Sequence, residues 1–243
     1  ISTLTDDFGV DTIIEIWPWQ GVLTRELLML CAKKSLACIA LEKDTGMEKH
    51  LRPYMGQGLE LIWGDVLDLD LTDNWLLADK IQNISKVLVV GNLPYYITSP
   101  IFRKFFSSSV FSEVHLFPGG VFLIQKEVAE KIMTGAAKKS YLRWILGVHY
   151  TVEYCFTVPP WAFTPPPKVD SAVVSFRKKN KPELYIEKEK TLLNVLNHIS
   201  PYKRKTLGKI QKMLEGKIHI PKNLHTKRLE ELNREEMREI IEM

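Results

Sequence analysis

Short apolar runs alternate with amphipathic segments over the first half of the chain. Apolar runs that end at polar or turn-forming residues predict buried strands at residues 12–17, 36–41, 59–65, 86–90 and 120–125. Helical periodicity between them predicts helices at residues 23–33, 46–55, 73–82, 100–107 and 126–134. Strands that alternate with helices predict a parallel, doubly wound α/β sheet, which holds its ligand outside the carboxyl ends of the strands.

The pattern changes in the second half. Two β-type runs, residues 149–158 and 171–179, are joined by the proline-rich loop 159–170, and no helix fits between them. This arrangement predicts an antiparallel pair of strands that closes the sheet. From residue 180 the chain is polar, basic and helical, so we expect an α/β domain at residues 1–180 and a small all-α domain at 181–243.

Charge is unevenly distributed along the chain. The net charge of the 243 residues is only +4, but the segment from Arg177 to the end has 17 Lys and Arg against 10 Asp and Glu. This concentration favours a polyanionic partner, although a merely solvated helical surface explains it equally well. No apolar run has the length of a membrane span and no signal peptide is visible, so we expect no membrane partner.

The cysteines and the first residue add two expectations. Cys31, Cys38 and Cys155 are odd in number and lack zinc-site spacing, so free thiols in a reducing compartment are expected. The chain begins at Ile1, close to the first strand, and an N-terminal segment is expected to be missing.

Acidic side chains follow the first three predicted strands. Glu15 lies near the end of the first, Glu42 and Asp44 follow the second, and Asp65 follows the third. A carboxylate after the second strand can hold ribose hydroxyls, and one after the third can accept a hydrogen bond from an adenine amino group. Each Asp could equally cap a helix, but their order along one βαβ series favours a nucleotide-like cofactor.

The fourth strand ends in Asn92-Leu93-Pro94-Tyr95. Asn offers a carbonyl acceptor, Pro fixes the backbone, and Tyr offers a flat face for stacking. Together they suit a planar base with an exocyclic amine, whose two hydrogens can bond to the Asn92 side-chain oxygen and to a main-chain carbonyl. That geometry draws the nitrogen lone pair out of ring conjugation, so the amine becomes nucleophilic without a metal. The alternative is an ordinary strand-to-helix turn in which Asn caps and Tyr packs.

Several segments resemble one family. GNLPYYITSPI at 91–101 is similar to the NLPY motif of the ribosomal RNA adenine N6,N6-dimethyltransferases, the KsgA/Dim family. The other segments resemble the same family in the same order: FLIQKEVAEKI (122–132), VPPWAFTPPPKVDSAVV (158–174), SPYKRKTL (200–207) and RLEELNREE (228–236). Macrolide-resistance methyltransferases, which are related, usually carry Ile at position 93 and lack this form of the proline-rich loop.

The resemblance implies a fold and an activity. The fold would be a Rossmann-like class I methyltransferase sheet with a C-terminal all-α domain. The activity would be transfer of methyl groups from S-adenosyl-L-methionine to N6 of two adjacent adenosines near the 3′ end of small-subunit rRNA. The partner would be the immature small ribosomal subunit, met by a monomer in the cytoplasm, or in the nucleus or an organelle of a eukaryote, during ribosome biogenesis.

The resemblance also implies roles for particular residues. Asn92, Leu93 and Pro94 would hold the target N6, and Tyr95 and Phe163 would sandwich the flipped base, unless Phe163 merely packs in the core. The cofactor would lie against Glu15, Trp17, Gly21, Ala40, Glu42, Asp65 and Asn92. The basic residues expected to meet rRNA phosphates are Arg177, Lys178, Lys179, Lys203, Arg204 and Lys205.

The cofactor half departs from the family pattern. Trp17 and Trp19 stand where the family has two glycines, so we expect the indoles to fill the pocket or strain the turn. Ala40 stands at the ribose-binding Glu position, with Glu42 two residues further on, and the family's N-terminal K-x-x-G-Q-x-F-L segment is absent.

Three functions therefore stay open. The first is an active dimethyltransferase. The second is a member with an impaired cofactor site, which acts only as an rRNA-binding assembly factor. The third is a DNA adenine methyltransferase, against which the leucine of Asn-Leu-Pro-Tyr and the basic C-terminal helices argue.

Overall fold

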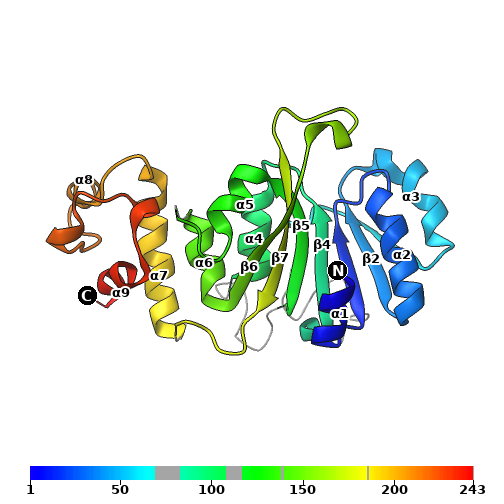
Figure 1. Ribbon diagram of the computed structural model, residues 1–243, viewed down its shortest axis with the longest axis horizontal. Helices are drawn as coiled ribbons and strands as arrows, with labels where there is room; N and C mark the ends of the chain where they lie inside the picture. The colour runs from blue at the N-terminus through cyan, green and yellow to red at the C-terminus, as the bar shows by residue number, and fades with distance from the viewer. Residues whose placement is uncertain (69–82, 108–116, 138–139, 185, 243) are drawn as a thin grey trace.

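The core of the protein is a seven-stranded sheet in the order β3-β2-β1-β4-β5-β7-β6 (Figure 1). The computed structural model describes residues 1–68, 83–107, 117–137, 140–184 and 186–242. Strands β1 to β5 run parallel, whereas β7 is antiparallel to both of its neighbours, β5 and β6. The predicted α/β sheet with an antiparallel edge pair is confirmed.

The strands lie close to the apolar runs that predicted them. Their bounds are β1 Thr12–Ile16, β2 Ala37–Glu42, β3 Leu59–Trp63, β4 Val87–Asn92, β5 Gly119–Gln125, β6 Tyr150–Val158 and β7 Ser171–Lys178. The α-helices are α1 Ser2–Phe8, α2 Val22–Lys34, α3 Glu48–Met55, α4 Thr98–Phe106, α5 Lys126–Ile132, α6 Tyr141–His149, α7 Ile186–Ile199, α8 Leu207–Met213 and α9 Arg234–Ile241. The helix predicted at 73–82 lies outside the described residues, and α1 and α6 were not predicted.

Helices cover both faces of the sheet (Figure 1). Alternate residues of a strand point to opposite faces. In β1, Ile14 and Ile16 therefore pack into the core beneath α4, α5 and α6, whereas Ile13 packs into the core beneath α1 and α2. Both faces are apolar, which explains why the parallel strands read as continuous hydrophobic runs rather than as alternating ones.

A separate core lies among the C-terminal helices. It is built from buried side chains of α7, α8 and α9, including Leu196, Leu207 and Ile240. Helix α6 also contributes Trp144, Ile145 and Val148 to this core. Among the described residues, no helix is long and apolar enough to cross a membrane.

Candidate active site

The site lies where the order of the strands reverses. Strands β1 and β4 are adjacent and parallel, although two strands separate them in sequence, and Ile16 pairs with Gly91. Residues 17 and 92 therefore leave the sheet side by side. A Cβ atom on Gly91 would lie 2.7 Å from the carbonyl oxygen of Ile16, so only glycine allows this approach of the two strands. Sheets of this kind bind ligands at such a reversal.

The loop after β1 has three residues with a left-handed backbone. The φ angles are 64° at Trp17, 53° at Trp19 and 82° at Gly21. This conformation costs a residue with a side chain about 1–2 kcal/mol, so the two tryptophans occupy positions that favour glycine. Trp17 packs partly buried against the core beneath α4, and Trp19 is 49% exposed. The expected strain at these two positions is therefore present.

Glu42 holds this loop in place. It is the last residue of β2, and its carboxylate accepts hydrogen bonds from the backbone N–H of Trp19 at 3.2 Å and of Asp44 at 2.8 Å. Burial raises the pKa of Glu42, and these backbone hydrogen bonds oppose that shift. Glu42 therefore stands at the strand end where a ribose-binding carboxylate is expected, but the protein's own donors occupy it.

Glu15 is buried beneath the same loop. Its Oε2 accepts a 2.6 Å hydrogen bond from the Thr24 hydroxyl on α2. Burial raises the pKa of Glu15 to about 7; the Thr24 bond opposes the shift and the nearby Glu42 carboxylate adds to it. Glu15 is only 1% exposed and therefore anchors α2 to the sheet rather than facing solvent.

Asp65 lies beyond the end of β3 and pairs with Lys43. Its Oδ2 is 2.7 Å from the Lys43 ammonium, and its Oδ1 accepts from the backbone N–H of Leu67 at 2.9 Å. Burial alone would raise the pKa of Asp65, but the bonds from Lys43 and Leu67 hold it below its ordinary value. Because the Lys43 side chain is 58% exposed, it can swing into solvent and leave Oδ2 open to a ligand's amino group.

The Asn92–Tyr95 turn presents polar groups above a buried anchor. Asn92 is exposed at the end of β4, whereas Leu93 is buried and donates its N–H to the carbonyl of Leu123 at 3.1 Å. The carbonyl of Pro94 accepts from the N–H of Ile97 at 3.1 Å, which begins the turn into α4. The Tyr95 hydroxyl bonds to the Ser171 hydroxyl at 2.8 Å, which fixes the ring against the start of β7.

The proline-rich loop projects beyond the sheet at this same edge (Figure 1). Ser171, the first residue after it, pairs with Gln125 at the end of β5. Phe163 lies in this loop, is partly buried, and donates its N–H to the Pro160 carbonyl at 3.1 Å. A cavity of about 450 Å³ opens beside the loop, lined by Gln125, Lys126, Glu127, Glu130, Pro160, Lys168, Val169 and Asp170. This cavity lies at the end of β5 and the start of α5, and its lining includes neither Asn92 nor Tyr95.

A family model described as ribosomal RNA adenine dimethylase matches residues 7–243. The chain belongs to this family. Its relatives include the ribosomal RNA small subunit methyltransferase A of Trichormus variabilis, 41% identical over 70% of this chain and 62% of the relative. The enzyme of the same name from Desulfitobacterium hafniense is 37% identical over 86% of this chain and 69% of the relative. The chain thus spans about two thirds of the length of these relatives.

Solved structures support the fold. The 23S rRNA methyltransferase ErmE covers 99% of this chain with a TM-score of 0.67 at 18% identity, and 95% of that chain is covered in turn. A dimethyladenosine transferase from Plasmodium falciparum covers 98% of this chain with a TM-score of 0.66 at 22% identity, and 92% of that chain is covered. The class I methyltransferase fold predicted from the family resemblance is confirmed.

Ala40 lies away from the strand ends in this family member. It is fully buried within β2, pairs with Glu15, and packs into the core beneath α2. Glu42, two residues further along the strand, reaches the edge of the sheet. Of the two positions considered for a ribose-binding group, only Glu42 places a polar side chain at that edge.

The predicted RNA-binding residues fall into two groups. Arg177 forms a 2.6 Å ion pair with Asp7, and the half-buried ammonium of Lys179 donates to the Gly147 carbonyl at 2.6 Å. Their charges are thus used within the protein, and Lys178 has a partner too. In contrast Lys203, Arg204 and Lys205 are all exposed, directly after the one-turn helix Ser200–Tyr202.

Some contacts of the site were not foreseen. The ion pair of Lys43 with Asp65 and the bond of Tyr95 to Ser171 join residues far apart in sequence. Tyr54 of α3 also lies against Gly21, where an added Cβ would meet its ring at 2.4 Å. The position of Lys43 after β2 was the signal in the sequence that could have predicted its ion pair, because a cation there can reach a carboxylate at the end of the neighbouring strand.

Proposed function

We propose that this chain is an S-adenosyl-L-methionine-dependent rRNA adenine N6,N6-dimethyltransferase that acts on two adjacent adenosines near the 3′ end of small-subunit rRNA. The observation that carries the proposal is the exposed amide of Asn92, at the strand reversal and next to a tyrosine held by Ser171. The names of the relatives and of the matching family support the same activity.

In this proposal the Asn92 side-chain oxygen accepts a hydrogen bond from the target N6, and the backbone carbonyl of Leu93 orients the second N6 hydrogen. Tyr95 and Phe163 stack on the flipped base, and Pro94 keeps the turn rigid. S-adenosyl-L-methionine, when bound, supplies an electrophilic methyl group. Transfer is then direct, and the protein contributes mainly position and the exclusion of water.

The residues at the strand ends suit the cofactor in part. Glu42 would hold the ribose, after giving up the Trp19 N–H, and Asp65 would accept from the adenine amino group, after releasing Lys43. Glu15 supports the loop from beneath, and Gly21 is the N-cap residue of α2. The Trp17 and Trp19 indoles are the groups that do not follow the family pattern, so the loop must rearrange around them.

The division of labour would follow the two parts of the chain. Residues 1–180 would form the methyltransferase domain and residues 181–243 the rRNA-binding domain, with Lys203, Arg204 and Lys205 against phosphates. Helix α7, which these three basic residues follow in the chain, ends on the same side of the molecule as the proline-rich loop, so that one RNA would contact both regions (Figure 1).

A second function has a specific observation in its favour. The left-handed tryptophans and the occupied Glu42 carboxylate favour a chain that docks on the immature small subunit without chemistry. Calorimetric titration of S-adenosyl-L-methionine, with S-adenosylhomocysteine as a second ligand, separates the two functions. Micromolar binding supports the enzyme, whereas no heat at millimolar cofactor supports the assembly factor.

Substitution of Asn92 tests the chemistry. Because Asn92 is exposed and its side chain is not part of the core, Asn92→Ala is expected to keep the melting temperature. Methyl incorporation into immature small subunits should fall by about 10²–10³-fold, the usual cost of losing one oriented hydrogen-bonding group at a reacting centre. Full activity of this variant would remove the central claim. Bare DNA duplex in the same assay tests for a DNA methyltransferase.

A further inference from the structure

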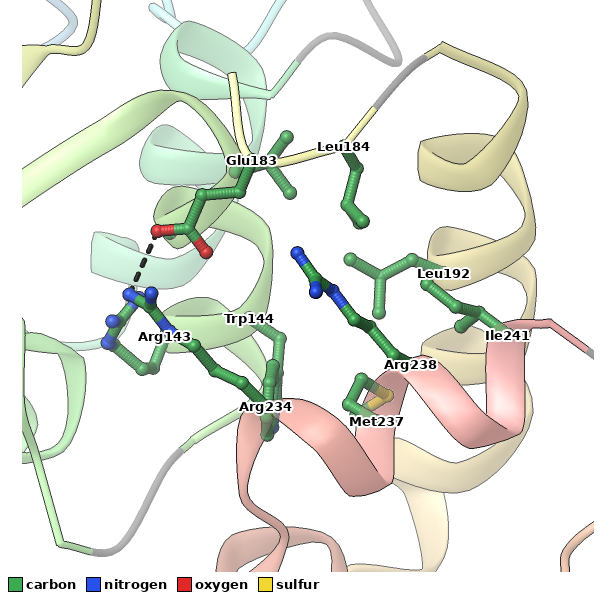
Figure 2. Close-up of a pocket in the computed structure, with 11 residues that line it drawn as sticks. Arg143, Trp144, Glu183, Leu184, Leu192, Arg234, Met237, Arg238 and Ile241 are labelled. Atoms are coloured by element: carbon green, nitrogen blue, oxygen red, sulfur yellow. Dashed lines mark ion pairs between the residues drawn. The ribbon is translucent and has the colours of Figure 1, made fainter. Parts of the chain in front are cut away.

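A crevice lined by residues of α6, α7 and α9 lies in the C-terminal part of the protein (Figure 2). Its volume is about 50 Å³, several times the roughly 10–15 Å³ that one water requires. The walls are largely apolar and come from Trp144, Val148, Leu184, Leu192, Met237 and Ile241. The polar lining consists of three arginines and one glutamate.

Arg143 forms the floor of the crevice. It is 6% exposed, and its Nε has no hydrogen-bond partner among the residues that the structure describes. The guanidinium folds back along its own helix over Gly147, where an added Cβ would lie 2.0 Å from Nη1. Burial lowers the pKa of Arg143; the nearby Glu183 carboxylate opposes that shift, and the charge of Arg234 adds to it. A buried guanidinium without a full set of acceptors is costly unless an anion joins it.

The mouth of the crevice has more positive than negative charge. Arg234 is 2.9 Å from Glu183, and the same carboxylate oxygen also pairs with Lys179. Arg238 is exposed and, within the described ranges, has no carboxylate within 4.0 Å. Glu183 is the one acidic residue in the lining, against three arginines, and it also pairs with Lys179, the residue directly after β7.

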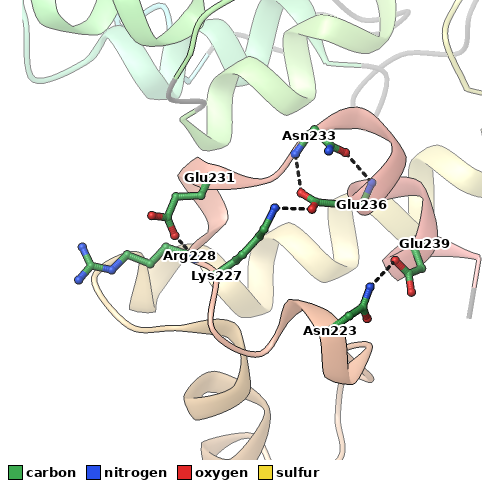
Figure 3. A network of polar contacts seen from close by, with 7 residues as sticks. All are labelled: Asn223, Lys227, Arg228, Glu231, Asn233, Glu236 and Glu239. Atoms are coloured by element: carbon green, nitrogen blue, oxygen red, sulfur yellow. Dashed lines mark hydrogen bonds and ion pairs between the residues drawn. The ribbon is translucent and has the colours of Figure 1, made fainter.

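The start of α9 is rigid enough to hold these arginines in place (Figure 3). Asn233 and Glu236 form a reciprocal cap, with both backbone-to-side-chain bonds at 2.9 Å. Lys227 pairs with the same Glu236 carboxylate. Arg234 is the first residue of the helix, so this cap fixes its Cα, and Arg238 follows one turn later on the same face.

We propose that this crevice binds a phosphate group, with Arg143 at its floor and Arg234 and Arg238 at its mouth. The guanidinium is the side chain best suited to such an oxyanion, because its planar fork donates to two oxygens at once. A phosphate there would lie beside the buried Arg143 side chain and would offset the excess positive charge of the three lining arginines. The group could be free phosphate or a backbone phosphate of RNA; the chemistry is shared, and the site does not depend on methyl transfer.

The first test is the effect of inorganic phosphate on the unfolding of the full chain, with sodium chloride at matched ionic strength as the reference. Phosphate at ten times its dissociation constant should lower the unfolding equilibrium constant about elevenfold. The Arg143→Met variant, which keeps an apolar stem and removes the guanidinium, should lose this effect. Arg52→Gln, which removes an exposed arginine on α3, should keep it.

Further variants keep the proposal testable if Arg143→Met does not fold. Arg234→Gln and Arg238→Gln alter exposed side chains, and each should weaken phosphate binding about tenfold, as expected when one charged partner of about 1.4 kcal/mol is lost. Phosphate stabilisation no greater than that of chloride, or equal stabilisation of the wild type and both variants, would overturn the proposal.

Small-subunit binding identifies the source of the phosphate. If Arg234→Gln weakens binding of the immature subunit and free phosphate competes with that binding, the group belongs to RNA. If subunit binding is unchanged while phosphate still stabilises the wild type, the group is free phosphate. Both outcomes support the site, and neither requires methyl transfer, so a failure of the proposed enzymatic function would not be mistaken for a failure of this site.

Discussion

At the scale of single residues, the loop after β1 is the most unusual feature of the protein. Trp17 and Trp19 both have a left-handed backbone conformation, so the loop keeps the backbone shape that glycine favours although tryptophan stands at both positions. The sequence was sufficient to predict strain at these two positions. It could not predict that Glu42 would hold the strained loop through the Trp19 N–H, because that contact depends on the loop's final conformation.

Replacement of Trp19 measures this strain. Trp19→Gly and Trp19→Ala both remove the indole, but only glycine relieves the left-handed backbone. The glycine variant should be more stable than the alanine variant by about 1 kcal/mol in urea denaturation. Equal stabilities would mean that the loop relaxes to another conformation once the indole is removed.

Glu15 should make stability depend on pH. Its pKa in the folded protein is about 7, above the ordinary value, so the folded state holds its proton more tightly than the unfolded state does. The contribution of Glu15 to the free energy of unfolding is therefore greatest at acidic pH. It falls as the pH rises toward about 7, where the buried carboxyl ionises. Glu15→Gln keeps an acceptor for Thr24 and removes the ionisation.

The size of this effect follows from the shift. The Gln variant should gain at most about 3 kcal/mol over the wild type at pH 8 and little at pH 5, measured by denaturant titration at both values. Glu26→Gln, an exposed change on the same helix as Thr24, serves as the control. A constant difference between Glu15→Gln and the wild type across this range would contradict the assignment.

At the scale of elements, strands were easier to predict than helices. Each parallel strand is a short apolar run with a turn residue behind it, and that signal is local. Helix α6 was not predicted because every residue from Leu142 to His149 is buried, so no polar face marks the helical period. It also passes directly into β6 at Tyr150, without a turn residue between the two elements.

Gly91 links the two strands that position the site. In Gly91→Ala the new methyl group would lie 2.7 Å from the Ile16 carbonyl, so β1 and β4 must separate. We expect a loss of about 1–3 kcal/mol in unfolding free energy, typical of overpacking. Gly64→Ala, at the end of β3, adds a methyl group with no atom within 4 Å and should have little effect. Equal stability of the two variants would contradict this account of the β1–β4 contact.

At the scale of the whole molecule, the fold divides the six basic residues predicted to contact RNA into two groups. The sequence predicted six basic residues, but the structure uses Arg177 and Lys179 in internal contacts, which depend on the tertiary fold. Lys203, Arg204 and Lys205 remain exposed.

The salt dependence of subunit binding tests this distinction. Changing Lys203, Arg204 and Lys205 together to Gln should weaken binding and should reduce the slope of log K against log salt by about 2, because each phosphate contact to single-stranded RNA contributes about 0.7. Arg177→Gln should leave the slope unchanged, since its charge is paired with Asp7. Binding that is unaffected by the triple change would exclude this surface as the RNA contact.

Helix α6 belongs to two cores at once. Leu142 and Leu146 pack beneath the sheet, whereas Trp144, Ile145 and Val148 pack among the C-terminal helices. A chimera joined at residue 180, with its C-terminal helices taken from a relative, would therefore pack α6 of one parent against α7 and α9 of the other. A graft that begins before Tyr141 would instead transfer both partners of that interface, and would move the mismatch to the contact of α6 with α4 and α5. The best junction for a chimera of this protein therefore depends on which face of α6 is kept with its original packing partners.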